Sequence, residues 1–250
     1  MITLRRHKQR RHSQRLEQEV WQTFCAQDRE DPLAVGFGDL EILNEDRLPP
    51  GAGASVPPHR HHDAEILTYV REGALAFEDT TGQSGVIQTG EFQRMTAGRG
   101  MRHSESNASR SNWAHSFQMW LRPSEAGLES SREQKRFSAA ERRGALCVVA
   151  SPDGRRGSLR IHQDALICSA LLETGQHVVH ELSEGRSAWL HIVRGEVTLG
   201  EVVLSTGDGA GVAGDRSVSL TAREATEILL VDMGGRLPRP ATQPGARAVV

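Results

Sequence analysis

The chain has 250 residues, of which 37% are hydrophobic and 25% charged, and its formal net charge is -2. This composition is that of a globular protein with room for two small domains or one large one. The small net charge and the lack of any apolar run near the roughly 20 residues that span a bilayer argue against nucleic acid and membrane as partners.

The first fifteen residues, MITLRRHKQRRHSQR, are basic and contain no acidic residue. They lack the apolar stretch of a secretory signal, so we interpret them as a solvated basic edge at the start of the fold. The three cysteines, Cys25, Cys147 and Cys168, form no CxxC pair and no even set. This usage indicates packing residues in a reducing cytoplasm, with Cys25 as the one cysteine to test for reactivity.

Short apolar runs, cut by Gly, Pro, Asn and Asp, follow one another along the chain. Clear examples are the segments 34–51, 65–95 and 187–212. Runs of four to eight residues rich in Val, Ile, Leu and Thr predict strands, and their regular spacing predicts a β-sandwich or barrel. The segments 65–92 and 188–212 resemble each other, which indicates an internal duplication.

The polar segment 121–157 separates the two halves and predicts a connection with one short helix at 138–144, SAAERRG. We therefore expect an N-terminal metal-binding barrel over 1–125 and a C-terminal barrel without a metal site over 126–236. The last residues, 237–250, are rich in Pro, Ala and Arg and predict a poorly fixed tail.

Two pairs of polar residues with a spacing of two carry the chemistry. They are His59 and His61 in PPHRHHDAEILTYV, and His103 and Glu105 in MTAGRGMRHSESN. Residues two apart on a strand share a face, so each pair points to one side. If the two segments run side by side, three imidazoles and one carboxylate converge on a site suited to a first-row divalent metal. A polar barrel face is the alternative for an isolated HxH pair.

The other histidines form no such pair. His62 alternates to the opposite face from its neighbours and is expected at the surface. His115 is expected in the barrel wall. The second half holds His162, His177, His180 and His191 without an HxH or HxE spacing, so we expect no second metal site.

At these residues the chain resembles the pirin family of the cupin superfamily, and in particular its bacterial members described as quercetin 2,3-dioxygenases. The motifs that carry the resemblance are WQTF, HRHHDAEILTYVREG, GEFQRMTAGRGMRHSE, FQMWLRP and EQKRF. The resemblance implies an all-β bicupin of two barrels with metal in the first alone, bound by His59, His61, His103 and Glu105. It implies iron as the metal, although Cu, Ni, Co, Mn or Zn could substitute.

The resemblance also implies a function, namely dioxygenation of a quercetin-like flavonol with O2. The metal would act as Lewis acid and template, and Glu105 could accept the substrate's hydroxyl proton. The alternative is an iron-binding, redox-sensitive regulatory protein that acts through a protein partner. A cupin isomerase or hydrolase is a third reading, which the MTAGRGxxHSE string argues against. We expect a monomer.

The chain departs from the family pattern near the site. Arg60 stands where the family usually has Pro, and Phe77 where it often has His. Phe77 either makes the wall more apolar or faces outwards. Arg60 and Arg102 could flank the opening. Four apolar residues could line the site or simply pack in the core: Met95, Met101, Phe77 and Phe117.

Overall fold

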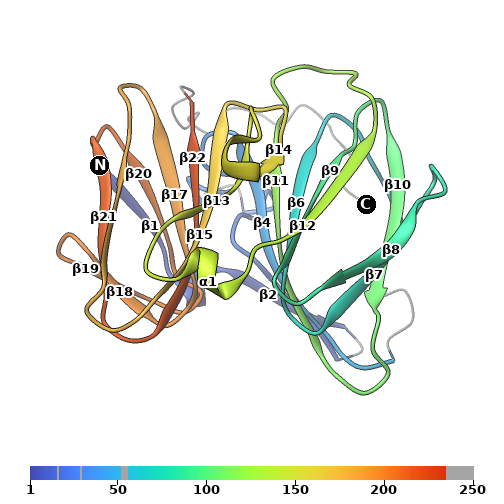
Figure 1. Ribbon diagram of the computed structural model, residues 1–250, viewed down its shortest axis with the longest axis horizontal. Coiled ribbons are helices and arrows are strands. Elements are labelled where there is room, and N and C mark those ends of the chain that lie inside the picture. Colours follow the sequence, from blue (N-terminus) through green and yellow to red (C-terminus); the bar gives the residue numbers. More distant parts are fainter. Residues whose placement is uncertain (16, 29, 52–55, 235–250) are drawn as a thin grey trace.

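The computed structural model describes residues 1–15, 17–28, 30–51 and 56–234, and for residues 15 and 56–60 it describes the backbone alone. It consists of 57% strand and 5% helix, so the expected all-β class is confirmed. Two barrels lie side by side with their larger sheets facing each other (Figure 1). Within the described residues, no helix is long and apolar enough to cross a membrane.

In the described part of the chain, the first barrel has one sheet of seven strands and one of four. The larger sheet runs in the order β12 (Ser131–Arg136), β9 (Glu91–Thr96), β6 (Glu65–Glu72), β11 (Ala114–Leu121), β4 (Leu40–Leu48), β3 (Gln18–Gln22) and β2 (Arg11–Arg15). The smaller sheet runs β5 (Val56–His61), β10 (Met101–Asn107), β7 (Ala74–Asp79) and β8 (Ser84–Gln88). β5 is an edge strand, which is where two consecutive prolines can be accommodated.

The second barrel repeats this plan over the residues that are described. Its larger sheet runs β1 (Ile2–Arg5), β20 (Gly209–Ala213), β17 (Ser187–Arg194), β22 (Thr226–Met233), β15 (Ala165–Leu172), β13 (Cys147–Ser151) and β14 (Leu159–Arg160). Its smaller sheet runs β16 (His177–Glu181), β21 (Ser217–Ala222), β18 (Glu196–Leu199) and β19 (Val202–Ser205). The order β5-β10-β7-β8 therefore matches β16-β21-β18-β19, as an internal duplication predicts.

The connection between the barrels contains the expected short helix. Helix α1 spans Ala139–Arg142, and Ser138 caps it by accepting a hydrogen bond from the backbone N–H of Glu141. The Glu141 side chain accepts from the N–H of Ser138 in return, which completes a capping box. Two 3₁₀ turns, η1 (His7–Gln9) and η2 (Arg155–Gly157), are the other helical segments described.

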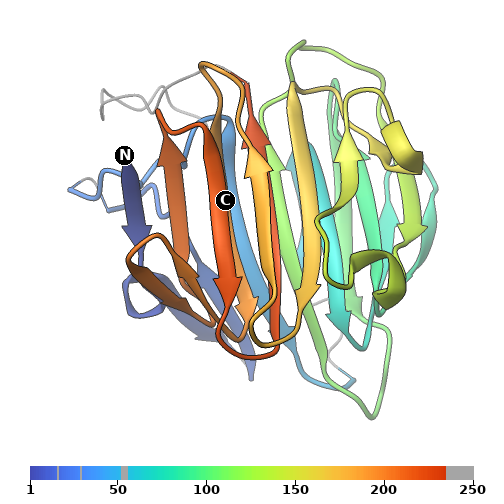
Figure 2. The ribbon, with the colours of Figure 1, turned by 60° about the vertical axis from the view of Figure 1, so that its left-hand side comes forward.

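The start of the chain joins the two barrels. Strand β1 pairs with β20 and stands in dark blue beside the orange strands of the second half (Figure 2). The Arg5 side chain is buried against Asp31, and the Arg10 side chain is buried against Glu45 on β4. The expected solvated basic edge is thus wrong for these two arginines, because each is buried in an ion pair with a carboxylate. The boundaries 1–125 and 126–236 stay a prediction, and the tail 237–250 lies outside the described residues.

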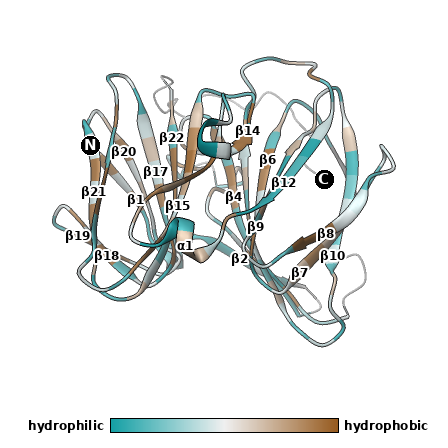
Figure 3. Cartoon of the chain, in the orientation of Figure 1, coloured by the Kyte–Doolittle hydropathy of each residue, from teal (hydrophilic) through white to brown (hydrophobic). Residues whose placement is uncertain are grey.

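The two barrels differ in what fills them. A large apolar cluster lies between the facing sheets and includes Phe117 and Trp189. A second large cluster of aliphatic side chains fills the second barrel. The first barrel holds two small clusters, one around Leu75 and one formed by Ile66, Met95 and Met101. Hydrophobic colours gather on strands in the middle of the molecule, whereas β12 is hydrophilic (Figure 3). The interior of the first barrel is therefore less apolar than that of the second.

Candidate metal centre

His61 and His103 lie next to each other inside the first barrel. Strand β5 pairs antiparallel with β10, which places Met101 opposite His61 and His103 opposite His59. His61 and His103 are 5% and 3% exposed, and their Nε2 atoms are 3.0 Å apart. The structure thus brings together two of the histidines that the sequence singles out.

Glu105 lies two residues further along β10, with its Oε1 3.8 Å from Nδ1 of His103. Gln118 on β11 donates a hydrogen bond from Nε2 to Glu105 Oε2 at 2.5 Å. The Gln118 Oε1 in turn accepts from Nε1 of Trp120 at 3.3 Å. Burial raises the pKa of Glu105 to about 7, although the Gln118 hydrogen bond and the charge of Arg132 both oppose the rise. Glu105 is therefore a carboxylate held in place but poorly solvated.

The glycine-rich turn before β10 explains part of the motif MTAGRG. Gly98 has a φ of +52°, and a Cβ at this position would lie 2.0 Å from the carbonyl oxygen of Leu128. Glycine alone fits both the left-handed backbone and this close approach. The turn leads directly into β10 and so fixes where the strand that carries His103 begins.

The neighbouring residues on β5 are described in part. The backbone of His59 faces that of His103, while the side chains of His59 and Arg60 lie outside the described residues. His62 is exposed, with half of its side chain in solvent, and its Nδ1 is 3.5 Å from Asp63. The predicted alternation, with His61 inward and His62 outward, is confirmed.

The described donors fit a divalent metal ion. Two nitrogens bound to one metal at about 2.1 Å and at right angles to each other lie about 3.0 Å apart, which is the separation of the two Nε2 atoms. A cation placed here would also favour the charged form of Glu105. The side chain of His59 is not among those that the structure describes. Among the described side chains, no three His, Cys, Asp or Glu residues gather for a metal. The set of four ligands stays a prediction.

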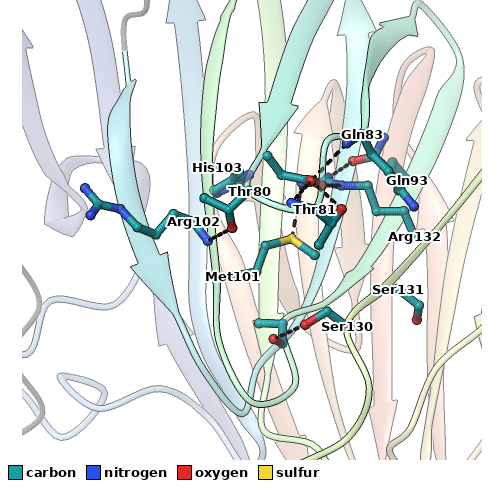
Figure 4. A network of polar contacts seen from close by, with 12 residues as sticks. Thr80, Thr81, Gln83, Gln93, Met101, Arg102, His103, Ser130, Ser131 and Arg132 are labelled. Atoms are coloured by element: carbon teal, nitrogen blue, oxygen red, sulfur yellow. Dashed lines mark hydrogen bonds and ion pairs between the residues drawn. The ribbon is translucent and has the colours of Figure 1, made fainter.

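Sequence reasoning missed a polar cluster around Arg132 of β12. Nε of Arg132 donates to Asp79 Oδ2 at 2.7 Å, and Nη1 donates to Gln93 Oε1 at 2.6 Å. Figure 4 shows Arg132, Gln93 and Met101 converging near His103, while Arg102 extends away from them. No short motif marks this cluster, because it joins residues that are more than 30 positions apart. A basic residue at an inward position of β12 is the one signal that strand alternation could have found.

Phe77 faces the interior of the first barrel. It is directly opposite Glu105 in the pairing of β7 with β10. It packs against the small cluster around Leu75, and the guanidinium of Arg132 lies 4.5 Å from the centre of its ring. Of the two readings left open by the sequence, the apolar wall is therefore the right one. Met95 and Met101 are buried core residues, and Phe117 packs between the barrels.

The second barrel carries different side chains on the corresponding strands. Where the first barrel has β5 beside β10, the second has β16 beside β21, with Val178 opposite Leu220. Both residues, together with Val218, belong to the aliphatic cluster that fills this barrel. These three side chains offer no metal-binding atom, and the absence of a second site stays a prediction.

The remaining histidines have other partners. His115 is hydrogen-bonded to Glu45 on the side that faces the second barrel. His180 is hydrogen-bonded to Asp232 at the edge of the second barrel. His191 is fully buried beside Phe117, and burial lowers its pKa to about 3, so it is neutral at physiological pH.

Comparisons with known proteins match this architecture. Residues 4–121 match the family model for pirin, and residues 148–233 match the model for the quercetinase C-terminal cupin domain. The quercetin 2,3-dioxygenase of Escherichia coli (strain K12) is 37% identical over 233 residues, which cover 93% of this chain and 99% of that protein.

Two solved structures are equally similar. The crystal structure of YhhW from Escherichia coli superposes with a TM-score of 0.88 at 37% identity, over 95% of this chain and 99% of that one. The structure of bacterial pirin YhhW from Escherichia coli in complex with nickel(II) superposes with a TM-score of 0.87 at 36% identity, over 94% and 100% of the two chains. From its paired cupin barrels, its two family matches and these relatives, the chain belongs to the pirin family.

Proposed function

We propose that this pirin is a metal-dependent dioxygenase that cleaves quercetin-like flavonols with O2. The observation that carries the proposal is the buried pair of His61 and His103, whose Nε2 atoms are 3.0 Å apart inside the first barrel, with the buried Glu105 two residues further along β10. The similar protein from Escherichia coli is named quercetin 2,3-dioxygenase, which supports this reaction class.

The proposed ligands are His59, His61, His103 and Glu105, and iron is the proposed metal. The similar pirin is described in complex with nickel(II), which supports a divalent metal ion in this chain but does not select iron. When bound, such an ion supplies Lewis acidity and a template that orients the substrate. The monomeric state and the cytoplasmic location also stay predictions.

The residues of the chain would supply binding, orientation and a base. Gln118 holds one oxygen of Glu105, which leaves the other oxygen turned towards His103. A carboxylate in this position could take up the hydroxyl proton of the substrate on binding, provided that the hydroxyl comes within hydrogen-bond reach. Phe77 and Met101 offer apolar contact to an aromatic ring. The burial of the group keeps bulk water from the reacting atoms.

The direct test is metal-dependent turnover. Purified protein is stripped of metal, loaded separately with Fe, Ni, Cu, Co or Mn, and followed by quercetin absorbance and O2 uptake. We expect coupled loss of both reactants with at least one metal. A loaded protein that binds metal but consumes neither quercetin nor O2 would contradict the proposal. A protein partner whose binding changes with the oxidation state of the iron would instead favour the regulatory alternative.

The first residue-level prediction concerns His61. His61→Ala removes a buried nitrogen next to His103 and should abolish most metal binding while the barrel still folds. His62→Ala is the matched control, since His62 is adjacent but exposed, and should bind metal like the unaltered protein. Metal content and the circular dichroism spectrum are measured on both variants. Full metal content in His61→Ala would show that the proposed ligand set is wrong.

A second prediction separates the roles of Glu105. Glu105→Gln keeps the size of the side chain and an oxygen that can still face the metal, but removes the basic carboxylate. We expect the variant to retain metal and to lose turnover by about 10²- to 10⁴-fold, the usual contribution of a general base. Metal content and O2 uptake are measured together. Unchanged turnover would exclude the base role, while loss of metal would assign Glu105 to binding.

A further inference from the structure

Arg132 is a cation that strand β12 carries into the first barrel. β12 pairs with β9, and Arg132 stands opposite Met95. Met95 belongs to the small apolar cluster inside the barrel, so Arg132 lies on the same inner face. The Arg132 side chain is only 6% exposed. Burying a guanidinium is costly unless its charge serves an interaction.

The guanidinium contacts residues that stand directly opposite the proposed ligands. Its Nε donates to Asp79, which is paired with His103. Its central carbon lies 4.5 Å from the centre of the ring of Phe77, which is paired with Glu105. Two of its contacts therefore place it beside the two ligands of β10.

A third contact points to the same place. Nη2 of Arg132 lies 3.6 Å from the sulfur of Met101, and Met101 is paired with His61 across β5 and β10. Nη1 donates to Gln93, which anchors the other end of the group. The guanidinium is thus held by Asp79, Gln93 and Met101 (Figure 4), and two of these residues stand opposite His103 and His61 in the strand pairing.

The hydrogen bonds do not use all of its donors. A guanidinium has five N–H bonds. Among the described residues, Arg132 gives one to Asp79, one to Gln93 and one weak contact to a thioether sulfur. Asp79 is itself shared, because its Oδ1 accepts from Thr81 and Gln83 of the turn after β7. Each guanidinium nitrogen thus has one partner among the described residues, while Nη1 and Nη2 each keep a second N–H bond that an oxygen brought into the site could accept.

We propose that Arg132 binds the substrate, by donating to an anionic oxygen of a deprotonated aromatic alcohol held beside the metal. The inference rests on the proposed function and names the chemical class that the site would select, namely phenolates and enolates over neutral aromatics. Charge-assisted hydrogen bonds from guanidinium to oxygen are short and strong, more so where water is excluded. The cation–π contact with the Phe77 ring helps to hold the guanidinium in place.

The test uses a coloured anion rather than turnover. Nickel-loaded protein is titrated with 4-nitrocatechol at mildly alkaline pH, where this probe is a phenolate whose absorbance changes on binding. We expect Arg132→Gln to weaken binding by about tenfold to a hundredfold, as for the loss of a hydrogen bond to a charged group. Arg132→Lys should recover part of the loss, and metal content should stay the same in all variants.

Variants of Asp79 test whether Arg132 serves only as the ion-pair partner of Asp79. Asp79→Asn keeps the oxygen that accepts from the turn but turns an amide N–H towards Nε of Arg132, so it should bind the probe more weakly than the unaltered protein and more tightly than Arg132→Gln. The double variant Asp79→Asn/Arg132→Gln removes both buried charges and should bind as weakly as Arg132→Gln. If the double variant binds tightly, Arg132 only neutralises Asp79 and the inference is wrong. It is equally wrong if the unaltered nickel-loaded protein does not bind the probe.

Failure of this inference differs from failure of the proposed function. Probe binding that depends on Arg132, without quercetin consumption by any metal form, would contradict the dioxygenase and keep the anion site. Quercetin turnover with an unchanged KM in Arg132→Gln would keep the dioxygenase and overturn the role of Arg132.

Discussion

Gln118 reaches Glu105 from the other sheet of the first barrel. It lies on β11, while Glu105 lies on β10 of the smaller sheet, and its two polar ends link Glu105 to Trp120. Trp120 in turn packs edge-on against His61, with ring centres 4.5 Å apart. One side chain thus orients a carboxylate and, through Trp120, supports a histidine of the same centre.

We expect Gln118→Leu to lower metal affinity by about 10- to 100-fold, because Glu105 loses the donor that holds it. Gln88→Leu is the control, since Gln88 is an exposed glutamine on β8 of the same barrel. Competition with a chelator gives the affinity of each variant for nickel. An affinity unchanged in Gln118→Leu would mean that Glu105 is held by its other contacts.

At the scale of the strand, the sequence predicts which side chains face inward and which face outward. The HxH and HxE spacings place His61 and His103 inward and His62 outward, because successive side chains on a strand alternate between faces. Alternation cannot say which strands become neighbours. The roles of Gln118 and Arg132 depend on pairing between distant segments, and so does the inward position of Phe77. The pairing of β1 with β20 joins residues about 210 positions apart and leaves no local signal.

The N-terminal segment is tied to β4 and β11 through one ionised carboxylate. Burial alone would raise the pKa of Glu45, but the hydrogen bond from His115 and the charge of Arg10 outweigh it and lower the pKa to about 2. The folded state therefore prefers the charged form, and its contribution to stability is present above the usual pKa of about 4.5. The contribution is lost as the pH falls from there towards 2.

The expected loss is about 3 kcal/mol across this acid range, since one pKa unit corresponds to about 1.4 kcal/mol. Glu45→Gln should be less stable at neutral pH, and its free energy of unfolding should fall less steeply on acidification. Glu184→Gln, at an exposed position of the second barrel, should follow the unaltered protein. Urea titrations at several pH values measure this. If the free energy of unfolding fell in parallel with pH for Glu45→Gln and the unaltered protein, Glu45 would not be the source of the acid sensitivity.

At the scale of the whole molecule, the two barrels are joined by a polar cluster at one end of the apolar interface. Tyr69 on β6 of the first barrel donates to Glu227 on β22 of the second. Arg142 of helix α1 donates to the Tyr69 hydroxyl and to Glu227, both at 3.0 Å, and Arg71 reaches Glu227 as well. These contacts link a strand of each barrel and the connecting helix through one buried carboxylate.

Glu227 is therefore expected to stabilise the pair of barrels. Glu227→Gln leaves the charges of Arg142 and Arg71 without their carboxylate in a buried place, and we expect it to cost about 3–5 kcal/mol. Glu196→Gln is the control, because Glu196 pairs with Arg223 in a partly exposed ion pair of the same barrel and should cost less than about 1 kcal/mol. Denaturant unfolding is followed by far-ultraviolet circular dichroism and by tryptophan fluorescence. If the barrels depend on this cluster, Glu227→Gln lowers the midpoint seen by both probes, whereas a loss no larger than that of Glu196→Gln would show that the apolar interface alone holds them together.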